Sequence, residues 1–200
     1  MSAPIDFWFD FSSPYGYLMA ERIDALAQKH GREVQWRPFL LGAVFKHTGG
    51  QPLPSHPMKG PYSRHDLQRS ARFLGLPLQL PESFAVSAHQ ACRVFYWLAA
   101  RNPQLARDFA LAVYRAFFVE GRDITSVDVL ADIGEKLDIA REAVVGATAD
   151  DAVKTHLREV CEAAIAGNVF GSPFVVIDGE PFWGADRLPQ IERWLESGGF

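Results

Sequence analysis

Four consecutive residues, Ser13-Pro14-Tyr15-Gly16, stand where sulfur chemistry is favoured in a folded chain. They follow an apolar run, Ile5 to Phe11, and open a stretch with helical spacing. The first turn of a helix leaves N–H groups without partners and carries partial positive charge, so a thiolate there is stabilised. Ser13 cannot become a thiolate, but its hydroxyl can donate a hydrogen bond to one. The pattern therefore indicates a thiol brought by a ligand.

Taken alone, Ser13-Pro14 is also an ordinary helix start, because serine is a good N-cap and proline fits the first helical position. A second segment favours the functional interpretation. Val169-Phe170-Gly171-Ser172-Pro173 leads directly into a predicted strand. If this proline is cis and faces the first helix, the backbone of Ser172 can pair with a peptide-like ligand as an added strand would. Two Ser-Pro pairs in these two places together predict one site.

The elements that must position this site begin with a strand, a helix and a second strand. Ile5 to Phe11 and Glu33 to Phe39 have strand character, and Pro14 to about Lys29 has helical spacing, with Gly31 as its stop. Pro38 favours an edge or a strand end for the second strand. A unit of this order pairs its two strands in parallel.

The middle of the chain is predicted to be helical after an irregular start. Gly42 to Pro61 is rich in Gly and Pro, and a long loop of this kind is more often functional than idle. Five helices are expected after it, at Asp66 to Leu74, Ser87 to Arg101, Pro103 to Val119, Ser126 to Leu137 and Asp150 to Ala166.

The end of the chain returns to strands. Pro173 to Asp178 and Glu180 to Trp183 predict an antiparallel hairpin, and Asp186 is expected to cap a last helix, Leu188 to Leu195. This order is the thioredoxin layout with an insertion. The predicted fold class is α/β, with a thioredoxin-like domain formed by residues 1–42 and 168–200 and a large inserted all-helical domain at residues 43–167.

Three segments resemble the 2-hydroxychromene-2-carboxylate isomerase family, bacterial relatives of the kappa-class glutathione transferases on the same inserted thioredoxin fold. They read F-D-F-S-S-P-Y-G-Y-L, then H-P-M-K-G-P-Y-S-R-H-D-L-Q-R-S-A-R-F-L-G-L-P-L, then V-F-G-S-P-F-V-V-I-D-G-E-P-F-W-G-A-D-R-L. The resemblance covers nearly the whole chain in the same order. It implies glutathione as cofactor, a small aromatic substrate and a homodimer.

The resemblance also implies roles for single residues near the thiol. Ser13 matches the family's glutathione-activating serine, and is the implied catalytic residue. Ser172 and Pro173 correspond to the segment whose backbone holds the cysteinyl part of glutathione. Lys59 matches a basic residue that binds a glutathione carboxylate, although a solvated surface lysine would look the same in sequence. Ser55 stands where the family usually has asparagine, so one hydrogen-bond donor is lost there.

At the other end of glutathione, the resemblance implies Ala185 and Asp186. Backbone N–H groups at the start of the last helix would take the γ-glutamyl carboxylate, and Asp186 would pair with its α-amino group. Asp66 and Arg69 match the family's D-L-x-R pattern, in which an ion pair within the helix and a ligand contact are equally expected.

Three activities follow from this site. The first is the isomerisation of 2-hydroxychromene-2-carboxylate and trans-o-hydroxybenzylidenepyruvate, a step of aromatic breakdown, by transient addition of the glutathione thiolate. The second is a kappa-like transferase or peroxidase. The third is a non-catalytic module that binds peptides or glutathione. Lys59 and Asp186 argue against it, because they match the charged groups at the two ends of glutathione. Disulfide exchange is excluded because Ser13 and Gly16 occupy both cysteine positions.

Composition excludes other classes of protein. A net charge of −4 without a basic run gives no reason to expect a nucleic-acid or anionic-membrane partner, and no apolar run reaches the ~20 residues of a membrane span. With no signal-peptide pattern and with Cys92 and Cys161 far apart, we expect a reducing, cytoplasmic setting and two small buried hydrophobes. The histidines show no metal-ligand spacing, so no metal site is predicted.

Overall fold

A four-stranded sheet in the order β2-β1-β3-β4 organises the computed structural model, which describes residues 3–200. The strands are β1 (Ile5–Phe9), β2 (Val34–Pro38), β3 (Phe174–Ile177) and β4 (Glu180–Trp183). β1 pairs with β2 in parallel and with β3 antiparallel, and β3 pairs with β4 antiparallel. The predicted parallel pair and the predicted hairpin are both confirmed.

Alternation of aromatic side chains explains why the first strand lies at the centre. Ile5, Phe7 and Phe9 are fully buried on one face of β1. The rings of Phe7 and Phe9 pack edge-on against Trp36 of β2, with ring centroids 5.1 and 5.3 Å apart. Burial of each such side chain stabilises the fold by about 1.5–3 kcal/mol. β2 is an edge strand, as the N–H-less Pro38 predicts.

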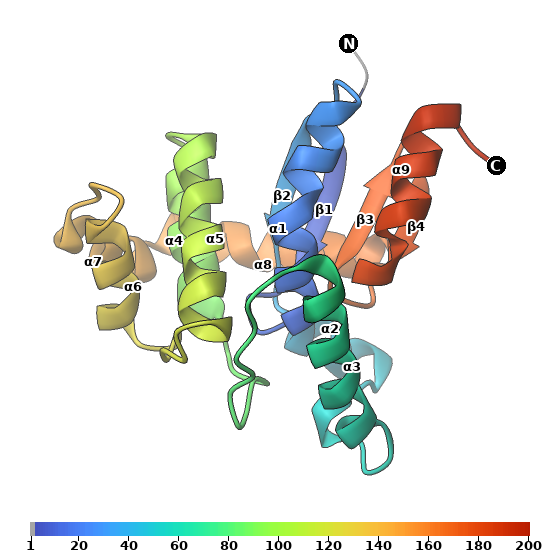
Figure 1. The fold of residues 1–200 in the computed structure, drawn as a ribbon. Helices are drawn as coiled ribbons and strands as arrows, with labels where there is room; N and C mark the ends of the chain where they lie inside the picture. The colour runs from blue at the N-terminus through green and yellow to red at the C-terminus, as the bar shows by residue number, and fades with distance from the viewer. Residues whose placement is uncertain (1–2) are drawn as a thin grey trace.

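Two helices lie side by side on one face of the sheet, α1 (Pro14–Lys29) and α9 (Leu188–Ser197) (Figure 1). α1 has the predicted bounds, and Gly31 follows it with φ +64°. In the same view α8 (Asp151–Ala166) passes behind the sheet. The Asp150 side chain caps α8 by accepting from two of its backbone N–H groups.

Helices also fill the chain between the second and third strands. They are α2 (Leu41–Thr48), a 3-10 turn (Leu53–Ser55), α3 (Lys59–Leu74), α4 (His89–Ala99), α5 (Pro103–Phe118), α6 (Val127–Glu135) and α7 (Arg141–Ala149). The predicted thioredoxin-like fold with helices inserted is confirmed; the exact domain boundaries stay a prediction.

The prediction of an irregular segment from Gly42 to Pro61 holds for residues 49–58, apart from a short 3-10 turn, and is wrong at both ends, which belong to α2 and α3. Pro61 lies in the first turn of α3, where its missing N–H costs little. α3 therefore starts seven residues before the predicted Asp66, because the proline does not stop it.

Two smaller helix predictions are also wrong. Ser87 does not cap α4, because its hydroxyl is bonded to the His89 ring at 3.0 Å and Ala88 is the N-cap. α7 was not predicted from the sequence. It is short and contains Gly146, so it forms by burying Val144 and Ala147 rather than by propensity.

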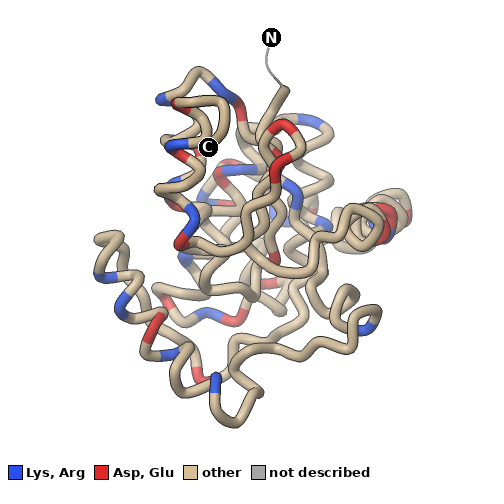
Figure 2. The backbone as a smooth tube through the Cα atoms, turned by 90° about the vertical axis from the view of Figure 1, so that its right-hand side faces the viewer, with Lys and Arg blue, Asp and Glu red and all other residues tan. Residues whose placement is uncertain are grey.

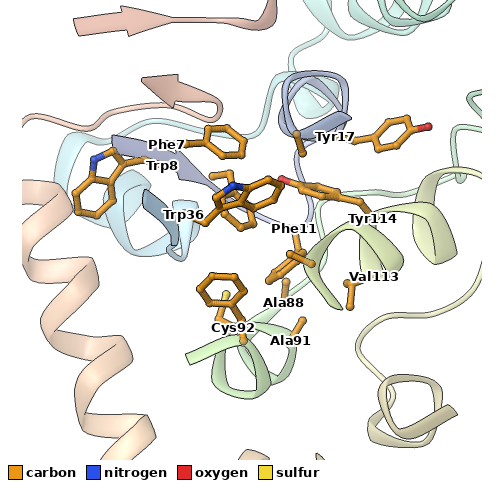
Figure 3. Packing of buried hydrophobic residues seen from close by; sticks show 14 of the residues in the cluster. Phe7, Trp8, Phe11, Tyr17, Trp36, Ala88, Ala91, Cys92, Val113 and Tyr114 are labelled. Atoms are coloured by element: carbon orange, nitrogen blue, oxygen red, sulfur yellow. The ribbon is translucent and has the colours of Figure 1, made fainter. Parts of the chain in front are cut away.

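One hydrophobic core runs from the sheet into the inserted helices. Phe11 and Tyr114 lie side by side between the end of β1 and α5, with ring centroids 5.4 Å apart (Figure 3). Tyr17 of α1 stacks on Phe118 of α5 at 5.8 Å. Cys92 joins this core, and like Cys161 it is a buried free thiol, as predicted.

The charged residues are distributed without a dominant sign. Figure 2 shows Lys and Arg interspersed with Asp and Glu along the part of the chain that the structure describes. No helix within residues 3–200 combines the length and the apolar character that crossing a membrane requires.

Candidate active site

Ser13 is the N-cap of α1 and lies at the centre of the candidate site. Its side-chain oxygen Oγ accepts a hydrogen bond from the Gly16 N–H at 3.1 Å and donates one to the carbonyl oxygen of Ser172 at 2.8 Å. The directions are fixed, because an amide N–H only donates and a carbonyl oxygen only accepts. Two residues that the sequence analysis assigned to one site, 159 positions apart, are therefore in direct contact.

The turn that carries Ser172 is anchored on both sides. The Ser172–Pro173 peptide bond is cis. The Ser172 hydroxyl accepts from the Asp10 N–H at 2.9 Å, and the Pro173 carbonyl accepts from the Gly184 N–H at 3.1 Å. This turn thus joins the end of β1 to the segment that leads into α9.

Gly16 allows the head of α1 to approach this turn closely. A Cβ added at Gly16 would lie 2.5 Å from the Tyr114 hydroxyl oxygen and 3.1 Å from Ser172 Oγ. The Tyr114 hydroxyl is held in place by donating to the Asp10 carbonyl at 2.9 Å. A cysteine side chain at position 16 would have no room, so the volume of the site, as well as its composition, excludes disulfide exchange by this helix.

Asp10 is a buried carboxylate beside the helix head that the sequence analysis missed. One carboxylate oxygen accepts from the Ser12 N–H and hydroxyl, and the other accepts from the Leu41 N–H, all at 2.7 Å. Burial raises the pKa of Asp10, and the hydrogen bonds from Ser12 and Leu41 oppose that rise. The sequence signal was an acid directly after an apolar strand and before a helix N-cap.

A second polar group lies two residues after Ser13, in the first turn of α1. The Tyr15 hydroxyl donates to the Asp66 carboxylate at 2.7 Å, and Asp66 also pairs with Arg69. Burial raises the pKa of Tyr15, as do the bond to Asp66 and the nearby charge of Asp186. Burial would raise the pKa of Asp66, but its bonds from Tyr15 and Arg69 hold it below the usual value. The expected Asp66–Arg69 ion pair is therefore present, and the charge of Asp186 acts on the Tyr15 hydroxyl that bonds to Asp66.

Asp186 belongs to a 3-10 turn, Ala185–Arg187, that contacts α1. The prediction that Asp186 caps the last helix is wrong, because this turn comes first and makes Arg187 the N-cap of α9. The Asp186 carboxylate lies 3.3 Å from the Arg187 guanidinium and its side chain is 73% exposed, whereas Ala185 is buried. A charged, accessible carboxylate thus stands beside the helix head.

Ser55 and Lys59 lie on the segment that joins the 3-10 turn to α3. A Cβ added at Gly60 would lie 2.5 Å from the Pro54 carbonyl oxygen, so these two elements are packed closely. The His56 ring nitrogen Nδ1 accepts from the Lys59 N–H at 3.2 Å and caps the start of α3. Both predicted side chains are exposed, and within residues 3–200 neither is hydrogen-bonded to Ser13. A side-chain contact joins α3 to the head of α1 at Asp66, seven residues along the helix from Lys59, so the assignment of Ser55 and Lys59 to the site stays a prediction.

One group of residues far from the helix head has metal-ligand character. His30, Glu192 and Glu196 place donor atoms within 4.8 Å of one another. Their separation along the chain explains why spacing did not reveal them. The Lys29 ammonium already pairs with Glu192 and lowers its pKa, so the cluster is explained as a charge network between α1 and α9.

Comparison with known proteins agrees with this geometry. The family model described as a DSBA-like thioredoxin domain matches residues 4–196. The 2-hydroxychromene-2-carboxylate isomerase of Pseudomonas putida is 33% identical over 94% of this chain and 92% of its own length. Glutathione s-transferase kappa 2 of Caenorhabditis elegans is 29% identical over 96% of this chain and 91% of its own.

A solved structure, that of selenomethionine 2-hydroxychromene-2-carboxylate isomerase, is similar with a TM-score of 0.87. It is 30% identical, and the similarity covers 97% of this chain and 95% of that one. Fold and length therefore agree with the resemblance stated from the sequence. The chain therefore belongs to the DSBA-like thioredoxin family, and its relatives include 2-hydroxychromene-2-carboxylate isomerases and kappa-class glutathione transferases.

Proposed function

We propose that the chain is a glutathione-dependent isomerase that interconverts 2-hydroxychromene-2-carboxylate and trans-o-hydroxybenzylidenepyruvate. One observation carries the proposal: the head of α1 brings the Ser13 hydroxyl to the backbone of Ser172 while Gly16 leaves no room for a protein thiol. The named isomerase relatives at 30–33% identity supply the substrate class.

The residues around the helix head fit the parts of glutathione by their chemistry. The helix N-terminus and Ser13 suit the sulfur, since both stabilise negative charge. The backbone of Ser172, before Pro173, suits the cysteinyl amide. Lys59, with Ser55 near it, suits the glycyl carboxylate.

The γ-glutamyl end of glutathione needs both a cationic and an anionic partner. Asp186 suits its ammonium group, and the backbone N–H groups around Ala185 suit its carboxylate. Asp66 adds a second carboxylate close to Tyr15, on the same side of the helix head as the charge of Asp186. The charges of the site thus complement a tripeptide with a carboxylate at each end and an ammonium group at the γ-glutamyl end.

When bound, glutathione supplies a thiolate that adds reversibly to the conjugated double bond, makes it single and so permits rotation. The chain contributes stabilisation and orientation. Ser13 and the first turn of α1 favour the ionised sulfur, which raises the fraction of reactive thiolate at neutral pH. Lys59, Ser172 and Asp186 hold the cofactor at three points, which limits its motion relative to the substrate.

A kappa-like transferase is the second candidate, favoured by the similarity to the kappa transferase of Caenorhabditis elegans. The two activities share the thiolate and differ in what happens next, because an isomerase releases its thiol and a transferase keeps it on the product. Accumulation of a glutathione adduct from a model electrophile, without isomerase turnover, would decide for the transferase.

The test is turnover of 2-hydroxychromene-2-carboxylate, followed by ultraviolet absorbance, with and without glutathione. We expect turnover that requires glutathione and leaves its concentration unchanged. Ser13→Ala removes a hydrogen bond to a charged group and should lower kcat/KM by about 10–100-fold. Ser83→Ala, a change of an exposed serine, is the matched control. Glutathione-independent turnover, or an unchanged rate in Ser13→Ala, contradicts the proposal.

A further inference from the structure

The Ser13 hydroxyl has a single proton, and the structure shows where it points. The Ser172 carbonyl oxygen, 2.8 Å away, is an acceptor only, so the proton lies on this contact. The oxygen at the same time accepts from Gly16 N–H. Ser13 is 8% exposed, so little water reaches it to supply an alternative partner.

A hydroxyl in this state cannot also donate to a sulfur atom. To do so it must turn its proton away from Ser172. The bond from Gly16 N–H can persist, because rotation about the Cβ–Oγ bond moves the proton and leaves the oxygen in place. The cost falls on the carbonyl of the half-buried Ser172, which loses its donor unless a ligand N–H replaces it.

The other hydroxyls donating around this contact have fixed acceptors of their own. Ser12 donates to the Asp10 carboxylate at 2.7 Å, and Tyr114 donates to the Asp10 carbonyl at 2.9 Å. Neither of these two acceptors is a group that we expect glutathione to contact. Ser13 is the donor whose acceptor, the backbone of Ser172, is also the group that suits a peptide-like ligand.

We infer that Ser13 exchanges partners when glutathione binds: the cysteinyl N–H of the ligand takes over the Ser172 carbonyl, and the Ser13 hydroxyl turns to the sulfur. The thiol proton leaves to solvent, and no other bond is made or broken. This inference rests on the proposed function and deepens it, because it makes ionisation of the thiol depend on the backbone N–H beside it.

The exchange predicts a specificity for thiols that carry an N–H directly on the CH of a CH–CH₂–SH unit, as a cysteinyl peptide does. A thiol without this donor would bind with the Ser172 carbonyl still holding the Ser13 proton. The helix N-terminus would then be the only group that stabilises its sulfur, so a smaller fraction of the thiol would be ionised. Discrimination of this kind needs no additional side chain, because both groups already belong to the site.

The experiment compares glutathione with its ester analogue, in which an oxygen atom replaces the cysteinyl N–H. Each is bound at saturation to the wild-type chain and to Ser13→Ala, and the thiolate fraction is followed by ultraviolet absorbance against pH, without substrate. With glutathione, Ser13→Ala should reduce the thiolate about tenfold at a fixed pH below the titration midpoint. With the ester, the wild-type chain should already have lost most of this thiolate, and Ser13→Ala should change it less than about threefold.

Ser83→Ala, a change of an exposed serine outside the site, is the matched variant. The dependence on both Ser13 and the N–H should survive in it. An equal effect of Ser13→Ala on glutathione and on the ester would overturn the exchange and leave glutathione use intact. Failure of the wild-type chain to bind glutathione in calorimetry would instead overturn the proposed function, and the exchange with it.

Discussion

At the scale of single residues, Gly16 decides how closely the head of α1 approaches the rest of the site. In a helix, alanine is ordinarily more stable than glycine by up to about 1 kcal/mol. Here a methyl group would meet the Tyr114 hydroxyl oxygen at 2.5 Å, and overpacking of this kind typically costs about 1–3 kcal/mol. The clash should exceed the gain in helix propensity.

We therefore expect Gly16→Ala to lower the free energy of unfolding, measured by urea denaturation. Tyr114→Phe removes the clashing oxygen, so the double variant should be more stable than the sum of the two single effects predicts. Gly146→Ala in α7 is the control, since nothing lies within 4 Å of its added Cβ, and it should be neutral or stabilising. Strict additivity of Gly16→Ala and Tyr114→Phe would contradict the close contact.

The residues of the site differ in how far the sequence could predict them. Ser13 and Ser172 stand beside prolines at the ends of predicted elements, so local pattern placed both at the site. Asp10 follows an apolar run, but no local pattern links it to Tyr114, because their contact joins residues 104 positions apart. Contacts of this kind depend on how α5 packs against β1, which periodicity alone does not specify.

At the scale of elements, α2 shows how a helix can form directly before a stretch rich in glycine and proline. Its N-cap, Leu40, has no polar side chain, and the buried Asp10 supplies the acceptor for the Leu41 N–H from another part of the chain. A helix start is normally recognised by a capping residue next to it in sequence. Because this cap lies 31 residues away, the local pattern predicted a loop.

This long-range cap gives stability a defined pH dependence. Burial raises the pKa of Asp10 above its ordinary value of 3.8, so the native chain holds this proton more tightly than the unfolded chain does. The contribution of Asp10 to the free energy of unfolding is therefore highest below pH 3.8 and falls as pH rises through the raised pKa. In Asp10→Asn this change is absent, so the stability difference, wild type minus variant, should decrease with pH over that window.

Asp123 provides the control of opposite sign for Asp10. Hydrogen bonds from Thr125 lower its pKa, so its contribution is present above pH 3.8 and is lost as pH falls through the lowered pKa. The difference between wild type and Asp123→Asn should therefore increase with pH. Both series are measured as urea unfolding at several pH values. If the stability difference between wild type and Asp10→Asn stays level or rises with pH, the charge of Asp10 is not unfavourably buried.

At the scale of the whole molecule, the inserted helices and the sheet share a continuous hydrophobic core. Phe9 of β1 contacts Phe95 of α4 and Tyr114 of α5, with ring centroids 6.2 and 5.7 Å apart. Tyr17 of α1 and Phe118 of α5 add a second contact at 5.8 Å. Removing either part would expose these aromatic rings to water, so neither part keeps its stability without the other. Helix α1 therefore packs against both parts.

This shared core predicts that the sheet and the inserted helices unfold together, although the chain is long enough for separate domains. In native-state hydrogen exchange, the most protected amides of β1 and of α5 should open with the same free energy. Phe118→Ala in α5 should lower the opening free energies of β1 and α5 by a similar amount, about 3–5 kcal/mol as for other buried phenylalanines. The control Phe73→Ala changes a ring that is 86% exposed and should lower neither. Loss of protection in α5 while β1 keeps its own would show that the insertion unfolds separately, and that the head of α1 depends on the sheet alone.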